Sequence, residues 1–93
     1  KRQRQMKPLS YAIIKHFTKV PEACAEDVID ALKGDYGKFR GLTLKSVIET
    51  LMTDEANGLL EESRFELDEV GNLRIYYRAN EEQKATINRY IKD

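Results

Sequence analysis

The sequence has a single cysteine, Cys24, and a single histidine, His16. One cysteine cannot form a disulfide within the chain, and a free thiol is typical of a reducing compartment, so we expect a cytoplasmic location. Zinc sites need several cysteine or histidine ligands at characteristic spacings, and His16 has no such partner nearby. We therefore expect no metal centre and no other cofactor.

Groups that carry catalysis are equally scarce. The acidic residues close to Cys24 would raise the pKa of its thiol rather than lower it, which favours an inert, buried side chain. The glycines at 34, 37 and 41 are too loosely spaced for a phosphate-binding loop, and the Lys-Ser/Thr pair of such a loop is missing. Catalysis requires a positioned acid, base or nucleophile, so the sequence predicts a protein that is not an enzyme.

Long apolar runs are absent as well. The longest aliphatic run is Ala12–Ile14, whereas a membrane-spanning helix needs about 20 mostly apolar residues, so we expect no membrane contact. No secretory signal pattern is visible. The 93 residues, 41% hydrophobic and 34% charged, fit one small globular domain with a modest core.

The net charge is zero, but the charges are unevenly distributed. Residues 1–7 contain four basic side chains and no acidic one, and we expect a flexible basic arm there, followed by one domain at residues 8–93. Since the whole chain has 16 basic and 16 acidic residues, the remainder carries 12 basic against 16 acidic side chains. Nucleic-acid-binding domains usually have a basic body, so this distribution weighs against simple DNA binding.

Three amphipathic helices are predicted, at about residues 8–18, 23–33 and 43–57, because apolar side chains recur there at helical spacing. The segment 34–37, with a glycine at each end, is expected to end the second helix in a left-handed turn. Thr43 has the hydroxyl of an N-cap for the third helix, and Asn57-Gly58 is expected to end it. The third helix has the clearest stripe, predicted to turn inward: Leu44, Val47, Ile48, Leu51 and Met52.

A hairpin and a fourth helix follow. Apolar and polar residues alternate along residues 59–68 and 72–79, the pattern of strands with one solvated face, and Gly71 lies in the turn between them. Asn80 and Gln83 form a capping box for a last helix, whose apolar stripe is Ile87, Tyr90 and Ile91. That helix is expected to pack on the first one.

The order of these elements resembles the winged helix-turn-helix superfamily. The most specific part is the end of the third helix, Val47–Leu51, followed by Ala56–Glu62. Winged-helix regulators of bacteria and archaea commonly have a similar step there: Gly58 lets the backbone reverse, and the two leucines after it fill the core. The resemblance implies an α+β, winged-helix-like fold, with three helices followed by a β-hairpin wing and a C-terminal helix.

Two features depart from that pattern. The segment between the second and third helices, about residues 34–42, is longer than the short turn of compact helix-turn-helix units. The first wing strand and its turn are also acidic, whereas a wing that lies on phosphates would normally be basic.

If the resemblance extends to DNA binding, the third helix enters the major groove with its polar side outward. Lys45 would donate to guanine, and hydroxyls would contact bases or phosphates. Glu49 fits on that side only if it accepts from a cytosine amino group. The candidate nucleic-acid contacts are Lys38, Arg40, Lys45, Ser46, Thr50, Thr53, Arg74 and Arg78.

A protein-interaction domain on the same scaffold is the alternative, since the acidic body suits a protein partner or a second copy. Tyr76 with Arg74 and Arg78 would form a strip of the residue types favoured at interfaces. The sequence thus predicts a recognition module, either a DNA-binding one with a regulatory role or a protein-binding one.

Overall fold

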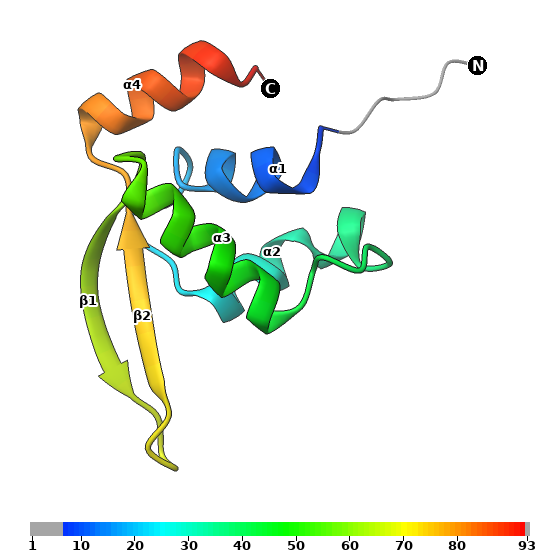
Figure 1. Cartoon of the computed structure of the whole chain (residues 1–93), viewed down its shortest axis with the longest axis vertical. Helices are drawn as coiled ribbons and strands as arrows, with labels where there is room; N and C mark the ends of the chain where they lie inside the picture. The colour runs from blue at the N-terminus through cyan, green and yellow to red at the C-terminus, as the bar shows by residue number, and fades with distance from the viewer. Residues whose placement is uncertain (1–6, 93) are drawn as a thin grey trace.

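The structure is a computed structural model that describes residues 7–92. The elements are α1 (Leu9–His16), α2 (Ala25–Tyr36), α3 (Leu44–Ala56), β1 (Glu61–Leu67), β2 (Leu73–Arg78) and α4 (Glu81–Tyr90). Figure 1 shows the first three helices grouped together, the hairpin projecting from one side, and α4 beside α1. The predicted α+β order is confirmed. No helix in residues 7–92 combines the length and apolar character needed to cross a membrane.

The core lies where the helices meet the base of the hairpin. The largest fully buried side chains come from α1, α2, α3 and the entry to β1, so burial ties the hairpin to the helices, at roughly 1.5–3 kcal/mol for each large apolar side chain. They include Phe17, Ile13, Leu51, Leu60, Val28 and Val47.

The predicted helix ends are confirmed at three places. The Ser46 amide donates to the Thr43 side chain over 3.3 Å, which caps α3. Gly58 has φ +81°, a left-handed value that glycine adopts at little cost, and it ends α3 as expected. At the start of α4 the Asn80 and Gln83 side-chain oxygens each accept from the other residue's backbone amide over 2.8 Å, which forms a capping box.

The predicted end of α2 was wrong. Gly34 lies inside the helix, which continues to Tyr36, and Gly37 has φ −59°, a right-handed value. Tyr36 explains the extra turn. Its side chain is buried, its hydroxyl donates to the Lys7 carbonyl, and its ring meets Phe39 edge to face. Burying this aromatic ring offsets the weak helix propensity of Gly34.

The predicted inward stripe of α3 was wrong for three of its five members. Val47 and Leu51 are buried, but Leu44, Ile48 and Met52 are 45%, 41% and 56% exposed. The helix packs on α1 and α2, which cover only its Val47–Leu51 side. The hairpin diverges from the helix toward its tip, so the rest of the apolar stripe stays uncovered (Figure 1).

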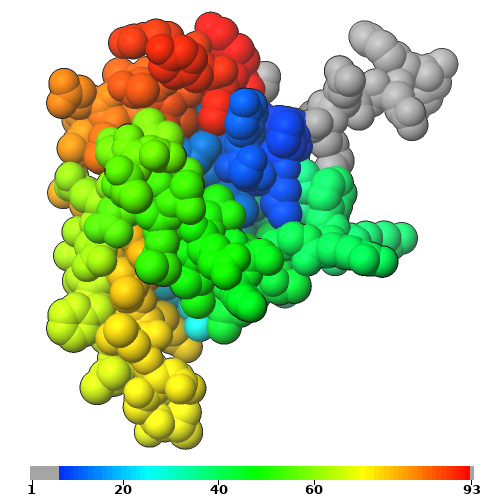
Figure 2. Space-filling model, in the orientation of Figure 1, coloured from blue at the N-terminus to red at the C-terminus, as the bar shows by residue number. Residues whose placement is uncertain are grey.

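The hairpin is antiparallel and has a register irregularity between Glu62 and Arg64. Phe65 pairs with Ile75, and paired residues share a face of the sheet. Tyr77 is buried at the base, where its backbone also pairs with Ala23, whereas Phe65 near the tip is 68% exposed. The predicted apolar face exists, but the core covers it only at the base. In Figure 2 the tip of the hairpin projects beyond the rest of the molecule.

The predicted packing of α4 on α1 is confirmed. The buried Lys15 ammonium donates to the Asn88 side chain and the Ile91 carbonyl, each over 2.6 Å. Ile87 is buried against the core, but Tyr90 is 75% exposed, so its assignment to the apolar stripe was wrong. The contact with α1 therefore buries Ile87 and leaves the Tyr90 ring in solvent.

Candidate nucleic-acid interface

The exposed side of α3 lies between the hairpin and the loop that joins α2 to α3 (Figure 1). Lys45, Glu49, Met52 and Thr53 are all exposed there. No acidic residue occurs in the first turn of α3, where the helix dipole favours an anion. This side of the helix is therefore accessible, and its N-terminal end is electrostatically suited to phosphate.

Ser46 and Thr50 lie on another side of the helix. Both are half-buried and line a shallow depression that also includes Ser10 of α1. The Thr50 hydroxyl donates to the Ser46 carbonyl over 3.0 Å, so it already has a partner. The structure thus separates these two candidates from Lys45, while Thr53 borders both surfaces.

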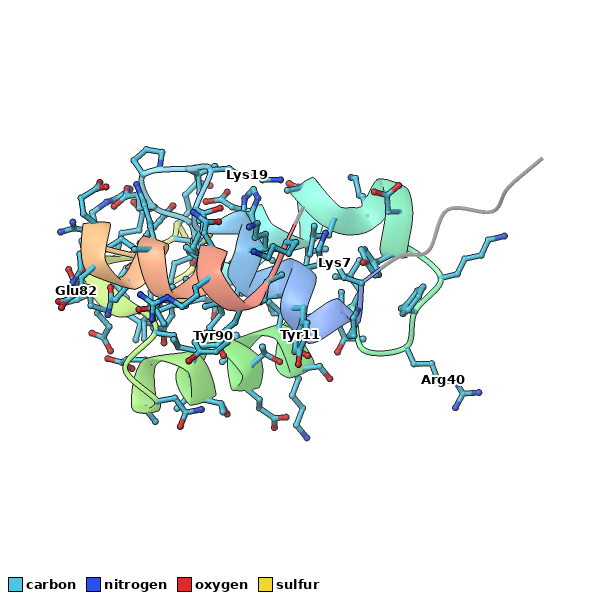
Figure 3. The ribbon with its side chains drawn as sticks, turned by 90° about the horizontal axis from the view of Figure 1, so that it is seen from above. Lys7, Tyr11, Lys19, Arg40, Glu82 and Tyr90 are labelled. Carbon is cyan, nitrogen blue, oxygen red and sulfur yellow. The ribbon has the colours of Figure 1, made fainter. Side chains whose placement is uncertain are left out.

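The basic candidates before α3 are on a protruding loop. Lys38 and Arg40 are exposed, and within residues 7–92 neither they nor Lys45 form an ion pair. Figure 3 shows Arg40 extending from the loop away from the helices. Phe39 between the two cations is 46% exposed. These positive charges are available to an outside anion.

The two wing arginines have carboxylate partners. Arg74 Nε lies 3.6 Å from Glu26 Oε2, and Arg78 lies 3.2 Å from Glu61 Oε2. Their charges are thereby largely balanced within the molecule. The wing candidates therefore differ in kind from the loop cations, which the sequence alone could not show.

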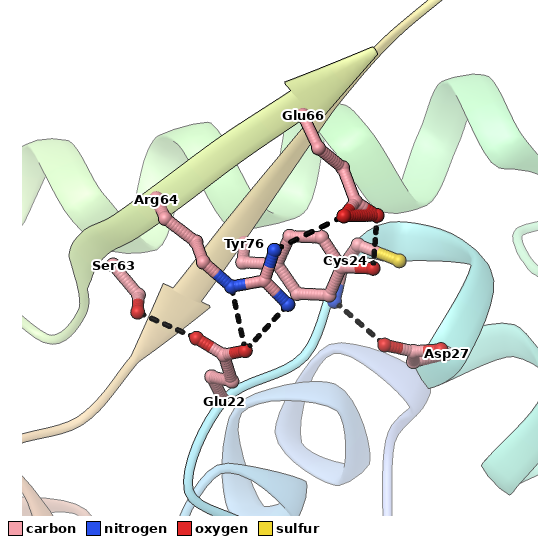
Figure 4. Close-up of polar contacts among 7 residues, drawn as sticks. All are labelled: Glu22, Cys24, Asp27, Ser63, Arg64, Glu66 and Tyr76. Atoms are coloured by element: carbon pink, nitrogen blue, oxygen red, sulfur yellow. Dashed lines mark hydrogen bonds and ion pairs between the residues drawn. The ribbon is translucent and has the colours of Figure 1, made fainter. Parts of the chain in front are cut away.

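A polar cluster on the outer face of the wing was not anticipated (Figure 4). Arg64 donates to Glu22 over 2.9 Å and to Glu66 over 3.1 Å, and its guanidinium stacks 3.9 Å from the Tyr76 ring centre. Ser63 donates to Glu22 and Tyr76 donates to Glu66. We call these five residues the wing clasp.

The wing clasp connects β1 to the segment before α2. Hydrogen bonds from Arg64 lower the pKa of both Glu22 and Glu66, so both carboxylates stay ionised near neutral pH. Glu22 and Arg64 are separated by 42 residues, and no local sequence pattern links them. The clasp also uses Tyr76, which the protein-interaction hypothesis had placed in a free strip.

A groove of about 350 Å³ separates α3 from β2. Its walls include the exposed apolar side chains of Leu44, Ile48 and Met52 on α3, and on β2 the exposed Leu73 and the partly buried Ile75. Two acidic residues, Glu26 and Asp68, also line it.

Both acidic residues of the groove are engaged within the molecule. Glu26 pairs with Arg74, and Asp68 accepts from the backbone amides of Asn72 and Val70, which lowers the pKa of its carboxyl. The groove is thus mainly apolar, and Asp68 gives its lining one net negative charge.

The cysteine and the histidine, the side chains with reactive chemistry, lie outside the α3 surface and the groove. Cys24 is buried, and burial raises the pKa of its thiol, as the sequence indicated. His16 is partly buried at the core edge, and burial lowers the pKa of its imidazole. Across residues 7–92, no three His, Cys, Asp or Glu side chains are grouped so that they could hold a metal ion.

Comparisons with known proteins identify the fold. No protein-family model and no curated protein matches the chain. It is similar to a solved structure described as the crystal structure of Bacillus subtilis PadR in complex with operator DNA, with a TM-score of 0.70 and 18% identity. The match covers 91% of this chain and 47% of the PadR chain, so this chain spans about half of that protein's length. The chain has a winged-helix fold.

Proposed function

We propose that this winged-helix chain is a DNA-binding module that reads the major groove with α3, as a transcription regulator or part of a larger DNA-associated protein. The observation that carries the proposal is the accessible side of α3 beside the unpaired cations Lys38, Arg40 and Lys45. An α-helix fits the major groove, and the similar PadR structure contains operator DNA. The role is recognition rather than catalysis, and a cytoplasmic location would accompany it.

In this mechanism Lys38 and Arg40 hold phosphates beside the groove. The capped N-terminus of α3 presents backbone N–H groups and its dipole to the same strand. Lys45 projects from the first turn of α3 and donates to guanine or phosphate. Thr53 lies further along the helix and contacts the same DNA strand there. Ser46 and Thr50 support the helix from its α1 side, and the paired Arg74 and Arg78 contribute weakly.

The number of free cations predicts weak binding by one copy. Each neutralised phosphate contributes about −0.9 to the slope of log affinity against log salt, so three cations give about −2.7. The basic arm of residues 1–7 would add to this, although residues 1–6 lie outside the described part of the chain. We therefore infer that two copies, or a larger parent protein, share one DNA site.

Fluorescence anisotropy with a labelled random-sequence duplex tests the proposal. The full chain should bind with submicromolar affinity at low salt and more weakly at moderate salt. The double variant Arg40→Glu/Lys45→Glu should abolish binding. Arg89→Glu, a charge reversal at an exposed position of α4, is the control and should bind nearly as wild type. Absence of binding at low salt by the wild-type chain would reject DNA binding.

Protein binding is the second candidate function, favoured by a specific observation. Phe65, Leu67 and Leu73 expose apolar side chains near the tip of the wing, and apolar patches on a soluble domain often mark protein contacts. A second copy is the simplest partner. Sedimentation velocity over a range of concentrations should then show a dimer, and Phe65→Ser should shift it to monomer. A wild-type chain that stays monomeric at all concentrations would contradict a second copy as the partner.

A further inference from the structure

The reading helix presents an unusual mixture of side chains to solvent. Leu44, Ile48 and Met52 recur every fourth residue, so they form one row along α3, and each is more than 40% exposed. Lys45 and Glu49 form the adjacent row and are exposed as well. A helix that contacted only phosphates would have no use for the apolar row.

We propose that Ile48 and Met52, assisted by Leu44, recognise the C5-methyl groups of thymines in the major groove. The inference rests on the proposed function and adds the chemistry of the preferred site. Thymine is the DNA base that presents a methyl group in the major groove, and apolar side chains recognise it by contact. The preferred sites would therefore contain thymine at the positions facing this row.

The geometry of the helix sets the spacing of those thymines. Four residues advance about 6 Å along an α-helix, whereas successive base pairs are about 3.4 Å apart. Ile48 and Met52 therefore reach methyl groups on different base pairs, about two steps apart. Glu49, beside them, accepts from a cytosine amino group, and Lys45 donates to a guanine.

Charge favours DNA over an apolar protein helix as the occupant of this row. Arg74 pairs with Glu26, whereas Asp68 stays ionised, so the groove lining carries one net negative charge. The cations Lys38 and Arg40 stand unpaired before the same helix. With Lys45, these cations outnumber the net negative charge of the groove, and a polyanion with methyl groups in its major groove matches both the cations and the apolar row.

The experiment first selects preferred duplexes of about 20 base pairs, roughly two helical turns, from a random pool with the full chain. The best duplex is then remade with deoxyuridine in place of thymidine. This removes the major-groove methyl groups and leaves the base-pairing groups unchanged. Anisotropy titrations should show about fourfold weaker binding for each contacted methyl, the scale of one buried CH₂ group.

Variants assign the effect to residues. Ile48→Ala and Met52→Ala should each reduce the ratio between thymidine and deoxyuridine affinities by about the same fourfold factor. Tyr90→Ala, which removes a large exposed side chain from α4, outside α3 and the wing, is the control and should leave the ratio unchanged. Circular dichroism checks that each variant keeps its helices.

The outcomes separate the two proposals. If no duplex binds at low salt, the proposed function fails and this inference falls with it. If duplexes bind but thymidine and deoxyuridine versions bind equally, methyl recognition is overturned while DNA binding stands. Equal reduction of the ratio by Tyr90→Ala also overturns it. An apolar row that serves a protein partner would leave DNA affinity unchanged in both Ile48→Ala and Met52→Ala, which is a further refuting result.

Discussion

The salt dependence of DNA binding should reveal which cations meet phosphates. We expect Lys38→Gln and Arg40→Gln each to make the slope of log affinity against log salt less steep by about 0.9, because each removes one neutralised phosphate. The pair together should change it by about 1.8. Arg74→Gln and Arg78→Gln should change the slope by nearly zero, since carboxylates already balance these arginines in the free protein.

The reasoning depends on what each side chain exchanges on binding. When an unpaired lysine or arginine neutralises a DNA phosphate, the cations condensed on that phosphate are released into solution, and this release makes the affinity depend on salt. Arg74 would first have to leave Glu26, which would then face the DNA as an unpaired negative charge.

The assay is a set of anisotropy titrations on one duplex at several salt concentrations. The N-terminal arm is retained in every variant, so its contribution cancels in the comparison. The argument would be refuted if Arg74→Gln or Arg78→Gln flattened the slope as much as Lys38→Gln does. In that case the internal ion pairs open freely on DNA, and the wing is a phosphate-binding element after all.

Three further predictions concern stability and the wing. Burial raises the pKa of Asp54 to about 6, and its Oδ2 finds no hydrogen-bond partner within residues 7–92. Wild-type Asp54 is therefore protonated and costs the fold no stability below about pH 4, and it destabilises the fold as it ionises while the pH rises through 6. The free energy of unfolding of Asp54→Asn, which cannot ionise, should exceed that of wild type by about 1–2 kcal/mol at pH 7.5. Urea denaturation at pH 4 should show this gain vanish, and a constant gain would contradict the pKa. Asn80→Ala removes the α4 cap and should lower the free energy of unfolding by about 1 kcal/mol in urea; an unchanged midpoint would mean that packing alone holds the helix. Arg64→Gln breaks the wing clasp, so amide hydrogens of β1 should exchange faster while those of α3 do not, and equal rates would show the clasp to be dispensable.

The sequence predicted the elements well because their signals are local. Caps such as Thr43 and Asn80, the left-handed Gly58 and the alternation in the strands each depend on neighbouring residues. The end of α2 was missed because its extra turn depends on Tyr36, whose hydroxyl reaches the distant Lys7. Burial from across the fold outweighed a local glycine signal there.

The candidate site was harder to predict for the same reason. Periodicity placed Ile48 and Met52 on the apolar side of α3, but it could not show that the hairpin would leave that side uncovered. It also treated all arginines as equal, although Arg74 and Arg78 meet acids while Arg40 does not. Which charge is free is decided by residues brought together from far apart in the chain.

The wing clasp gives the hairpin a fixed starting position relative to the helices. A two-stranded hairpin alone is marginally stable in water, and a mobile one would lose entropy each time it settled against a ligand. Here Arg64 lies between Glu22 and Glu66 over the Tyr76 ring and fixes the hairpin during folding, so the entropy is lost then and not on binding. Association by such a prearranged surface should be fast and should depend little on temperature-driven rearrangement of the wing.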